Sequence, residues 1–274
     1  MCRHIACLGP SEPLGEVLVR PRHALVRQSW EPRRQRHGTV NADGFGVGWY
    51  ADDDPVPARY RRAGPIWADL SFADLARVVR SGAVLAAVRD ATEAGADGEA
   101  AAAPFAAGPW LFSHNGALTG WPVSAAPLAA TLPPAELLGM AARCDSALIW
   151  ALVLHRLREG DPLGQALADS VTDLAAAAPG SRLNLLLTDG TAIAATAWGD
   201  TLWYLTEPGT TASTASTTTG STGSTGSTGA DAGRTVVASE PYDDGPGWRE
   251  VPDRTLLVAT RTDVQLTPLK EPTA

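Results

Sequence analysis

The order in which strand-like and helix-like segments follow one another limits the possible folds of this chain most strongly. Short apolar runs typical of strands come first, at Arg3 to Gly9, Phe45 to Tyr50, Ala83 to Arg89 and Trp110 to Ser113. Helical spacing follows, at Ala135 to Leu157 with a break at 143–145, and at Leu163 to Ala178. Strand-like runs then return, at Leu183 to Thr188, Thr191 to Trp198, Thr201 to Leu205, Thr235 to Ala238 and Leu256 to Ala259. This order predicts a layered α+β domain with two sheets.

Two Asp/Gly turns and one low-complexity tract mark the last third of the chain. Asp189-Gly190 and Gly199-Asp200 separate β-rich runs, and each predicts a hairpin. Residues 210–229 are dominated by Ser, Thr and Gly, which bury little apolar area, so we expect a disordered insertion there. Strand-like sequence continues on both sides of this tract. We therefore interpret residues 2–274 as a single domain with a long hairpin loop inside it.

Glycine and serine point to two local features. Gly46 and Gly48 alternate with bulky residues in a strand-like run, which indicates that another backbone or a ligand passes close to them. Ser71 precedes helical spacing over residues 71–80 and predicts the N-cap of a helix. The segment from Ala91 to Gly108 is rich in Ala, Gly and acidic residues, and we expect a mobile loop there.

The formal net charge of −8 argues against nucleic acid or an anionic membrane as a partner, because phosphate binding needs clustered Lys and Arg. The Arg-rich stretch from Arg20 to Arg36 is the local exception. It fits either a solvated loop or a rim that attracts an anionic substrate. No run of roughly 18 or more apolar residues is present, so we expect no membrane span.

The first residues and the cysteines indicate a reducing compartment. The chain starts with charged residues and lacks the apolar stretch of a signal peptide. The three cysteines, Cys2, Cys7 and Cys144, argue against a disulfide framework, and we expect a cytoplasmic protein. Cys7 and Cys144 fit small core residues. Neither a CxxC nor an HExxH pattern occurs, so we expect no metal site.

Cys2 carries two reactive groups if Met1 is trimmed, as expected before so small a side chain. A free α-amino group has a pKa of about 8 and a thiol a pKa of about 8.5, so the amine can accept the thiol proton directly or through a water. The thiol is then a nucleophile that needs no separate histidine base. The alternative is that Cys2 is an ordinary apolar residue at the start of a strand.

Five short motifs carry a resemblance to a known family. They are Met1-Cys2-Arg3-His4, the segment NADGFGVGWY at 41–50, Val88-Arg89-Asp90-Ala91-Thr92, Phe112-Ser113-His114-Asn115-Gly116 and Cys144-Asp145-Ser146. In this order and at this spacing they resemble the class II glutamine amidotransferase domain, a branch of the N-terminal-nucleophile hydrolases. Residues 183–190 and 238–241 are also similar to that family. The resemblance implies a four-layer αββα sandwich of two stacked, mainly antiparallel sheets flanked by helices.

The resemblance also implies the chemistry of three residues. Cys2 would attack the γ-carbonyl carbon of a glutamyl group and form a thioester. Asn115, through its side-chain amide, and Gly116, through its backbone N–H, would form the oxyanion hole, where one donor typically lowers the barrier by about 3 kcal/mol. Taken without the other motifs, Asn115-Gly116 also fits a type I′ turn.

Four further residues would bind the substrate. Arg89 matches the residue that holds the glutamyl α-carboxylate, and Asp145 matches the one that holds the α-ammonium. Thr92 and His114 would lie beside the same pocket, without a proton-transfer role for His114. Each has a plainer interpretation from its position: Arg89 as a surface charge, Asp145 as a helix N-cap and His114 as a structural hydrogen-bonding residue.

The chain departs from the family pattern in two ways. Related amidotransferases commonly carry an aromatic residue where Asp90 stands, and a tighter Thr-x-Gly where this chain has Thr92-Glu93-Ala94-Gly95. The chain also lacks room for the synthase domain that consumes ammonia in many members, and it has no Gly-rich phosphate loop. A stand-alone domain implies hydrolysis, with no cofactor and no obligatory protein partner.

Among stand-alone members, the sequence most resembles the amidohydrolases of ergothioneine biosynthesis. These remove glutamate from a small molecule, γ-glutamyl-hercynylcysteine sulfoxide, and leave hercynylcysteine sulfoxide. The substrate carries a trimethylammonium group, which aromatic faces attract. Candidate aromatic residues are Trp49, Tyr50, Trp110, Trp121 and Trp248. Asp243 and Asp244 would add negative charge.

Two other functions stay open at this stage. The first is a glutaminase-like enzyme of the same fold, which acts on another γ-glutamyl compound or supplies ammonia to a separate synthase. The second is a catalytically inactive module that senses a metabolite through the glutamate pocket. Loss of Cys2 or of the Asn115-Gly116 pair would favour the module, and the chain retains all three residues.

Overall fold

The computed structural model describes residues 2–91, 98–209 and 233–270. Two sequence predictions fall outside these ranges: Thr92 beside the pocket, and the disordered insertion at 210–229.

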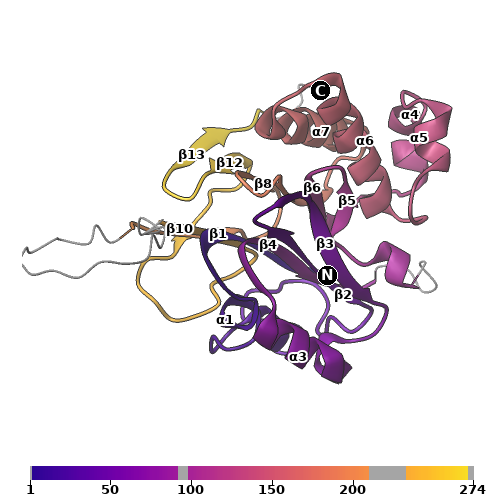
Figure 1. Cartoon of the computed structure of the whole chain (residues 1–274). Helices are drawn as coiled ribbons and strands as arrows, with labels where there is room; N and C mark the ends of the chain where they lie inside the picture. The colour runs from indigo at the N-terminus through magenta and orange to yellow at the C-terminus, as the bar shows by residue number, and fades with distance from the viewer. Residues whose placement is uncertain (1, 92–97, 210–232, 271–274) are drawn as a thin grey trace, which may run out of the picture.

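Two antiparallel sheets form the centre of the molecule (Figure 1). The first sheet has the order β11 (Arg249–Glu250), β9 (Trp203–Glu207), β10 (Arg234–Ala238), β1 (Arg3–Pro13), β4 (Arg80–Val88), β2 (Phe45–Ala51) and β3 (Asp54–Arg62). The second has the order β13 (Val264–Pro268), β12 (Thr255–Ala259), β8 (Ile193–Ala197), β7 (Arg182–Thr188), β6 (Trp110–Ala117) and β5 (Phe105–Ala107).

Helices cover the outer faces of both sheets. The first sheet is covered by α1 (Gly15–Leu18), α2 (Leu25–Gln28) and α3 (Leu70–Val78), with the 3₁₀ turn η1 (Ile66–Ala68) before α3. The second sheet is covered by α6 (Asp145–Glu159) and α7 (Leu163–Ala177). Shorter elements complete the fold: η2 (Gly98–Ala101), η3 (Val123–Ala125), α4 (Ala126–Ala129) and α5 (Pro134–Leu138).

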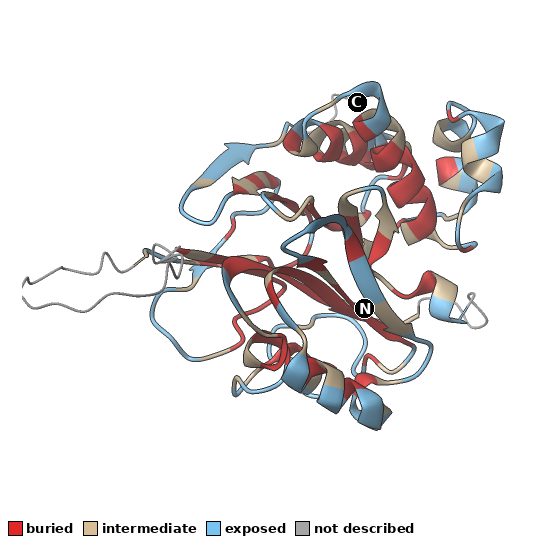
Figure 2. Cartoon of the chain, viewed as in Figure 1, coloured by how far each residue is buried: buried red, intermediate tan, exposed pale blue. Residues whose placement is uncertain are grey.

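Three separate apolar cores hold these four layers together (Figure 2). Alternate residues of β1 point to opposite faces of the sheet, as the period of a strand requires. Ile5 and Cys7 therefore pack under the helices α1–α3, whereas Ala6 and Leu8 pack between the two sheets. The third core lies between the second sheet and the helices α6 and α7. The predicted αββα sandwich is confirmed.

The two glycines of β2 lie where the second layer passes close to the first, as their pattern predicts. A Cβ on Gly46 would overlap the carbonyl oxygen of Ala103 and come within 3.0 Å of Pro104 Cδ. A Cβ on Gly48 would lie 2.6 Å from Leu111 Cδ1 in β6. Any larger residue at either position would push the second layer away from the first.

The structure corrects several local predictions. The N-cap of α3 is Asp69, whose side chain accepts the Phe72 N–H, and Ser71 lies inside the helix. Asp189-Gly190 joins the paired strands β7 and β8 as predicted. The hairpin predicted at Gly199-Asp200 is wrong, because β8 belongs to the second sheet and β9 to the first.

Residues between Asp54 and Ala107 contain two strands that the sequence pattern did not indicate. The edge strand β3 is exposed over most of its length and buries only Pro57, so it lacks an apolar periodicity. The segment Ala91 to Gly108, expected to be a loop, contains η2 and the short strand β5 in its described part. The strands β9 and β10, which flank the low-complexity tract, pair antiparallel.

The basic stretch from Arg20 to Arg36 is held to the surface by acidic partners. Arg22, His23 and Arg33 surround the Asp244 carboxylate at 2.9–3.2 Å. Asp244 is therefore engaged with two arginines and His23 and does not supply a free negative charge. Within the described ranges, no helix has the length and apolar character needed to cross a membrane.

Replacing Gly46 with Ala should destabilise the fold. The added methyl group collides with backbone from the opposite layer, which cannot rotate away, so we expect a loss of about 2–3 kcal/mol in the free energy of unfolding. Urea denaturation measures it. The control is Gly64→Ala, where the added methyl meets no atom within 4 Å. Equal midpoints for the two variants would contradict this packing.

Candidate active site

The first residues of the chain lie at the centre of the first sheet, where β1 runs between β10 and β4. Arg3 pairs with Val88 in the β1–β4 register, so the next step along both strands sets Cys2 opposite Arg89. The end of β6 and the start of α6 lie at the same end of the sandwich. One pocket collects side chains from all of these elements: Cys2, Arg89, Asp90, Ala91, Gly116, Trp121, Arg143, Cys144, Asp145 and Ser146.

This pocket is narrow and strongly polar. Its free space is about 30 Å³, enough for about two water molecules. Two guanidinium groups and two carboxylates line it, from Arg89, Arg143, Asp90 and Asp145. Arg143 is exposed, whereas Arg89 and Asp145 are partly buried.

The thiol of Cys2 is shielded from solvent, and this burial raises its pKa. The Asp90 backbone N–H and the positive charge of Arg89 act in the opposite direction, because both stabilise a thiolate. Burial has the larger effect, so the resting group is a neutral thiol. The sulfur therefore needs a proton acceptor before it can act as a nucleophile.

Arg89 is fixed by the turn that precedes β2. Its Nη1 donates to the Asp43 carbonyl oxygen at 3.2 Å. The Arg89 N–H donates to the Gly44 carbonyl, and the Asp43 carboxylate accepts the Ala91 N–H at 2.8 Å. The sequence predicted a turn at Asn-Ala-Asp-Gly but not its role in the site. In this turn, Asp43 forms hydrogen bonds with the Arg89 side chain and with the backbone that follows Arg89.

Asp145 is fixed at the start of α6. Its two carboxylate oxygens accept the N–H groups of Leu118, at 3.0 Å, and of Ser146, at 2.7 Å. The N-cap is Cys144, so Asp145 is the first helical residue rather than the cap. A carboxylate in the first turn lies near the positive end of the helix dipole.

Gly116 and Asn115 lie within β6 rather than in a turn. They pair with Leu183 and Asn184 of β7. Gly116 lines the pocket, and a Cβ there would overlap the Arg182 carbonyl oxygen, so only glycine fits. Asn115 is fully buried and its Nδ2 lies 3.4 Å from Ser239 Oγ. The pocket's lining residues do not include Asn115.

His114 has a structural position. Its Nε2 lies 3.0 Å from the Arg182 carbonyl oxygen, which only accepts, so the proton is on Nε2. Its Nδ1 lies 2.9 Å from the Ser146 hydroxyl. Both ring nitrogens are occupied, and the ring ties β6 to β7 and to the start of α6. His114 lines a small cavity behind Cys2 and does not line the pocket itself.

Several lining residues were absent from the predicted site. Cys144 is partly buried, packs against the core under α6 and α7 and also lines the pocket, whereas Cys7 is in the core as predicted. Burial raises the pKa of the Cys144 thiol to about 11. Arg143 directly precedes the Cys-Asp-Ser motif. Its charge beside that motif was the only sequence signal that could have identified it as a lining residue.

Of the five candidate aromatic residues, Trp121 lines the pocket. Trp49, Tyr50, Trp110 and Trp248 do not. Trp248 donates its Nε1–H to Asp243 at 2.8 Å, so this carboxylate, like Asp244, is engaged elsewhere.

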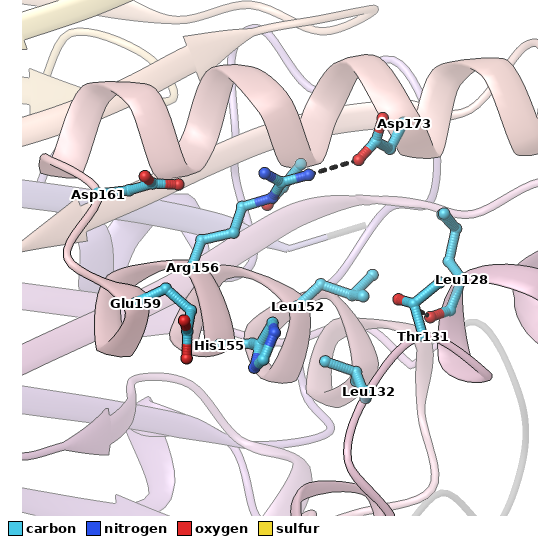
Figure 3. Close-up of a pocket in the computed structure, with 10 residues that line it drawn as sticks. Leu128, Thr131, Leu132, Leu152, His155, Arg156, Glu159, Asp161 and Asp173 are labelled. Atoms are coloured by element: carbon cyan, nitrogen blue, oxygen red, sulfur yellow. Dashed lines mark hydrogen bonds and ion pairs between the residues drawn. The ribbon is translucent and has the colours of Figure 1, made fainter.

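A larger hollow of about 370 Å³ lies between α4, α6 and α7, away from Cys2 (Figure 3). The Arg156–Asp173 ion pair, at 2.5 Å, crosses its upper side. None of the predicted site residues lines it. Size alone therefore does not identify the chemical site of this molecule. In the described part of the chain, His, Cys, Asp and Glu form no group of three or more suited to hold a metal ion.

Comparisons with known proteins agree with this geometry. Residues 23–273 match the family model of the class II glutamine amidotransferases. The chain is 38% identical, over 98% of its length, to the γ-glutamyl-hercynylcysteine sulfoxide hydrolase of Mycolicibacterium smegmatis, all of which is covered. It is equally similar to the protein of that name from Mycobacterium tuberculosis, of which 97% is covered.

Solved structures share the fold. A class II glutamine aminotransferase domain protein from Silicibacter pomeroyi superposes with a TM-score of 0.63 at 23% identity, covering 98% of this chain and 100% of the other. The glutamine phosphoribosylpyrophosphate amidotransferase of B. subtilis gives a TM-score of 0.61 at 17% identity. It covers 98% of this chain, which corresponds to 49% of that larger chain.

His4, two residues after Cys2 in the chain, should make the fold sensitive to acid. It is fully buried, its Nδ1 lies 3.2 Å from Ser113 Oγ, and burial lowers its pKa to about 3. The unfolded chain binds this proton below pH 6.5 and the native chain does not. Stability is therefore complete above pH 6.5 and falls as the pH drops towards 3, by about 2 kcal/mol at pH 5.

Denaturation at pH 7 and pH 5 measures this loss. In His4→Asn the difference between the two pH values should shrink by about 2 kcal/mol, whatever the absolute stability of the variant. An unchanged difference would show that His4 is not buried in its neutral form.

Proposed function

Because this chain belongs to the class II glutamine amidotransferase family, we propose that it is an amidohydrolase of γ-glutamyl-hercynylcysteine sulfoxide. It removes glutamate and releases hercynylcysteine sulfoxide, a step of ergothioneine biosynthesis. The main observation behind the proposal is that Cys2, Arg89, Gly116 and Asp145 line one pocket at the start of the central strand β1. The near-complete coverage of the two hydrolases by this chain supports the same substrate.

The first chemical step begins at the N-terminus, once Met1 has been removed. The α-amine of Cys2 accepts the thiol proton, and the thiolate attacks the γ-carbonyl carbon of the substrate. The C–N bond then breaks, and the proton passes from the α-ammonium to the leaving nitrogen. Products of this step are a γ-glutamyl thioester on Cys2 and the free amine.

Water completes the cycle. The α-amine, now neutral again, accepts a proton from a water that attacks the thioester carbonyl. The C–S bond breaks, glutamate leaves, and the proton returns to the sulfur. The net reaction consumes one water and yields one glutamate and one amine, with no cofactor.

The pocket offers partners for both ends of the glutamyl group. We assign the α-carboxylate to Arg89 and the α-ammonium to Asp145, because these opposite charges are fixed by backbone hydrogen bonds before substrate binds. The oxyanion donors are the Gly116 N–H and the second amide proton of Asn115. Thr92 completes the proposed glutamyl site.

Trp121 is our candidate for contact with the trimethylammonium group of the leaving amine. An indole face attracts a quaternary ammonium, by about 0.5–2 kcal/mol depending on its exposure. Trp121 is partly buried and lies at the pocket, which the other four candidate aromatics do not line.

Three free thiols support a proposal for the compartment in which the enzyme works. Cys2, Cys7 and Cys144 are all free thiols, as expected in a reducing cytoplasm. We propose that the enzyme works there without an obligatory protein partner.

A comparison of two substrates tests the proposed function. The enzyme should hydrolyse γ-glutamyl-hercynylcysteine sulfoxide far faster than glutamine, with glutamate release as the assay. A faster rate with glutamine would favour the second candidate, a glutaminase-like enzyme that can supply ammonia to another chain. No hydrolysis of either compound, with substrate still bound, would favour an inactive binding module.

The role of Cys2 predicts two losses of activity. Cys2→Ala should abolish hydrolysis while substrate binding, measured by calorimetry, persists. An N-terminal fusion that cannot be cleaved should also abolish it, because the α-amine becomes an amide without a basic nitrogen. The control is the same fusion after proteolytic release of Cys2, which should regain activity. An active, intact fusion would overturn the α-amine as the base.

A further inference from the structure

We propose that Arg143 selects γ-glutamyl amino acids over simple γ-glutamyl amides, by binding the carboxylate on the carbon next to the scissile nitrogen. The inference rests on the proposed function and concerns the leaving group, for which the glutamyl-binding residues provide no recognition. The ligand of this subsite is thus an α-amino acid whose nitrogen is acylated by glutamate.

The charges of the pocket motivate this subsite. A glutamyl group presents one carboxylate and one ammonium, and Arg89 with Asp145 matches both. The lining also includes Asp90 and Arg143, and Arg143 is the second guanidinium of the pocket. Glutamine offers it no anion, since its leaving group is ammonia. A γ-glutamyl amino acid offers a second carboxylate, two bonds from the nitrogen that departs.

The second carboxylate of such a substrate would lie near the mouth of the pocket, because the glutamyl group occupies the buried end. Cys2, Arg89 and Asp145 are partly buried, whereas Arg143 is exposed. The glutamyl group occupies the inner end, where its two partners are anchored, so the amine beyond the scissile bond extends outwards. Arg143 lies on that outward path.

The backbone under Arg143 is held firmly enough to aim it. Cys144 caps α6, and Asp145 is bonded to Leu118 of the adjoining segment and to Ser146. Arg143 directly precedes this fixed pair. Its position is therefore set by the residues that bind the glutamyl ammonium, and the two subsites keep a constant separation.

The chemistry of arginine suits this task. A guanidinium presents paired N–H donors that match the two oxygens of a carboxylate, and it stays charged at any physiological pH. Charge-assisted hydrogen bonds of this kind give about 10- to 100-fold in affinity, and exposure reduces the gain towards the lower end.

Two substrates that differ by one carboxylate test the proposal. The first is γ-glutamyl-S-methylcysteine sulfoxide, and the second is its decarboxylated analogue, γ-glutamyl-S-methylcysteamine sulfoxide. The wild-type enzyme should prefer the first by about 10- to 30-fold in kcat/KM. In Arg143→Gln that preference should fall to nearly one, through loss on the first substrate alone, with the rate on the second unchanged.

Two further variants make the test specific. Arg77→Gln is the control, since Arg77 is an exposed arginine of α3 that pairs with Asp74 away from the pocket. It should keep the full preference. Arg143→Glu should disfavour the carboxylate more strongly than Arg143→Gln, because it replaces attraction with repulsion. Thermal unfolding confirms that each variant is folded.

The contradicting outcomes are distinct. Equal losses on both substrates in Arg143→Gln would mean that Arg143 supports the glutamyl site or the fold, and an unchanged preference would mean that another residue reads the carboxylate. Either result overturns the inference and leaves the proposed function intact. Hydrolysis of neither substrate by the wild-type enzyme would overturn both.

Discussion

The antiparallel pairing of β1 with β4 and β10 is the interaction on which the site depends. It holds the first residues of the chain at the centre of a seven-stranded sheet. Without such pairing, the first residues of a chain are usually poorly ordered. The same register sets Cys2 opposite Arg89, so the proposed nucleophile and the proposed carboxylate-binding residue are positioned by one ladder of backbone hydrogen bonds. Next to Cys2, Arg3 has a buried guanidinium whose pKa is lowered by burial, and the negative charges of Glu240 and Asp200 oppose this shift.

Much of the fold could be predicted from the sequence, because strand and helix periodicities are local signals. The two-sheet sandwich and the close approach at Gly46 follow from them. The pairing of strands into sheets does not. Gly199-Asp200 has the composition of a hairpin turn, yet the chain crosses there from one sheet to the other, which depends on what each flanking strand packs against. The edge strand β3 has little apolar area to bury, so it carries no periodic signal.

The site could be predicted only in part. Cys2, Arg89, Gly116 and Asp145 belong to short motifs, and the structure brings them into one pocket. Arg143 and Cys144 line it because α6 begins there. The place of this helix start beside the pocket depends on tertiary packing, which no local sequence pattern encodes. The same holds for His114, whose two hydrogen bonds to separate elements give it a structural position.

Mass spectrometry of the intact protein, quenched during turnover of γ-glutamyl-hercynylcysteine sulfoxide, tests most directly whether Cys2 is the nucleophile. The pocket holds two thiols, so the position of the adduct decides between them. We expect the mass of one glutamyl group to be added, and peptide mapping to locate it on a Cys2 that has lost Met1. A glutamyl group on Cys144, or turnover of a protein that still carries Met1, would contradict this mechanism.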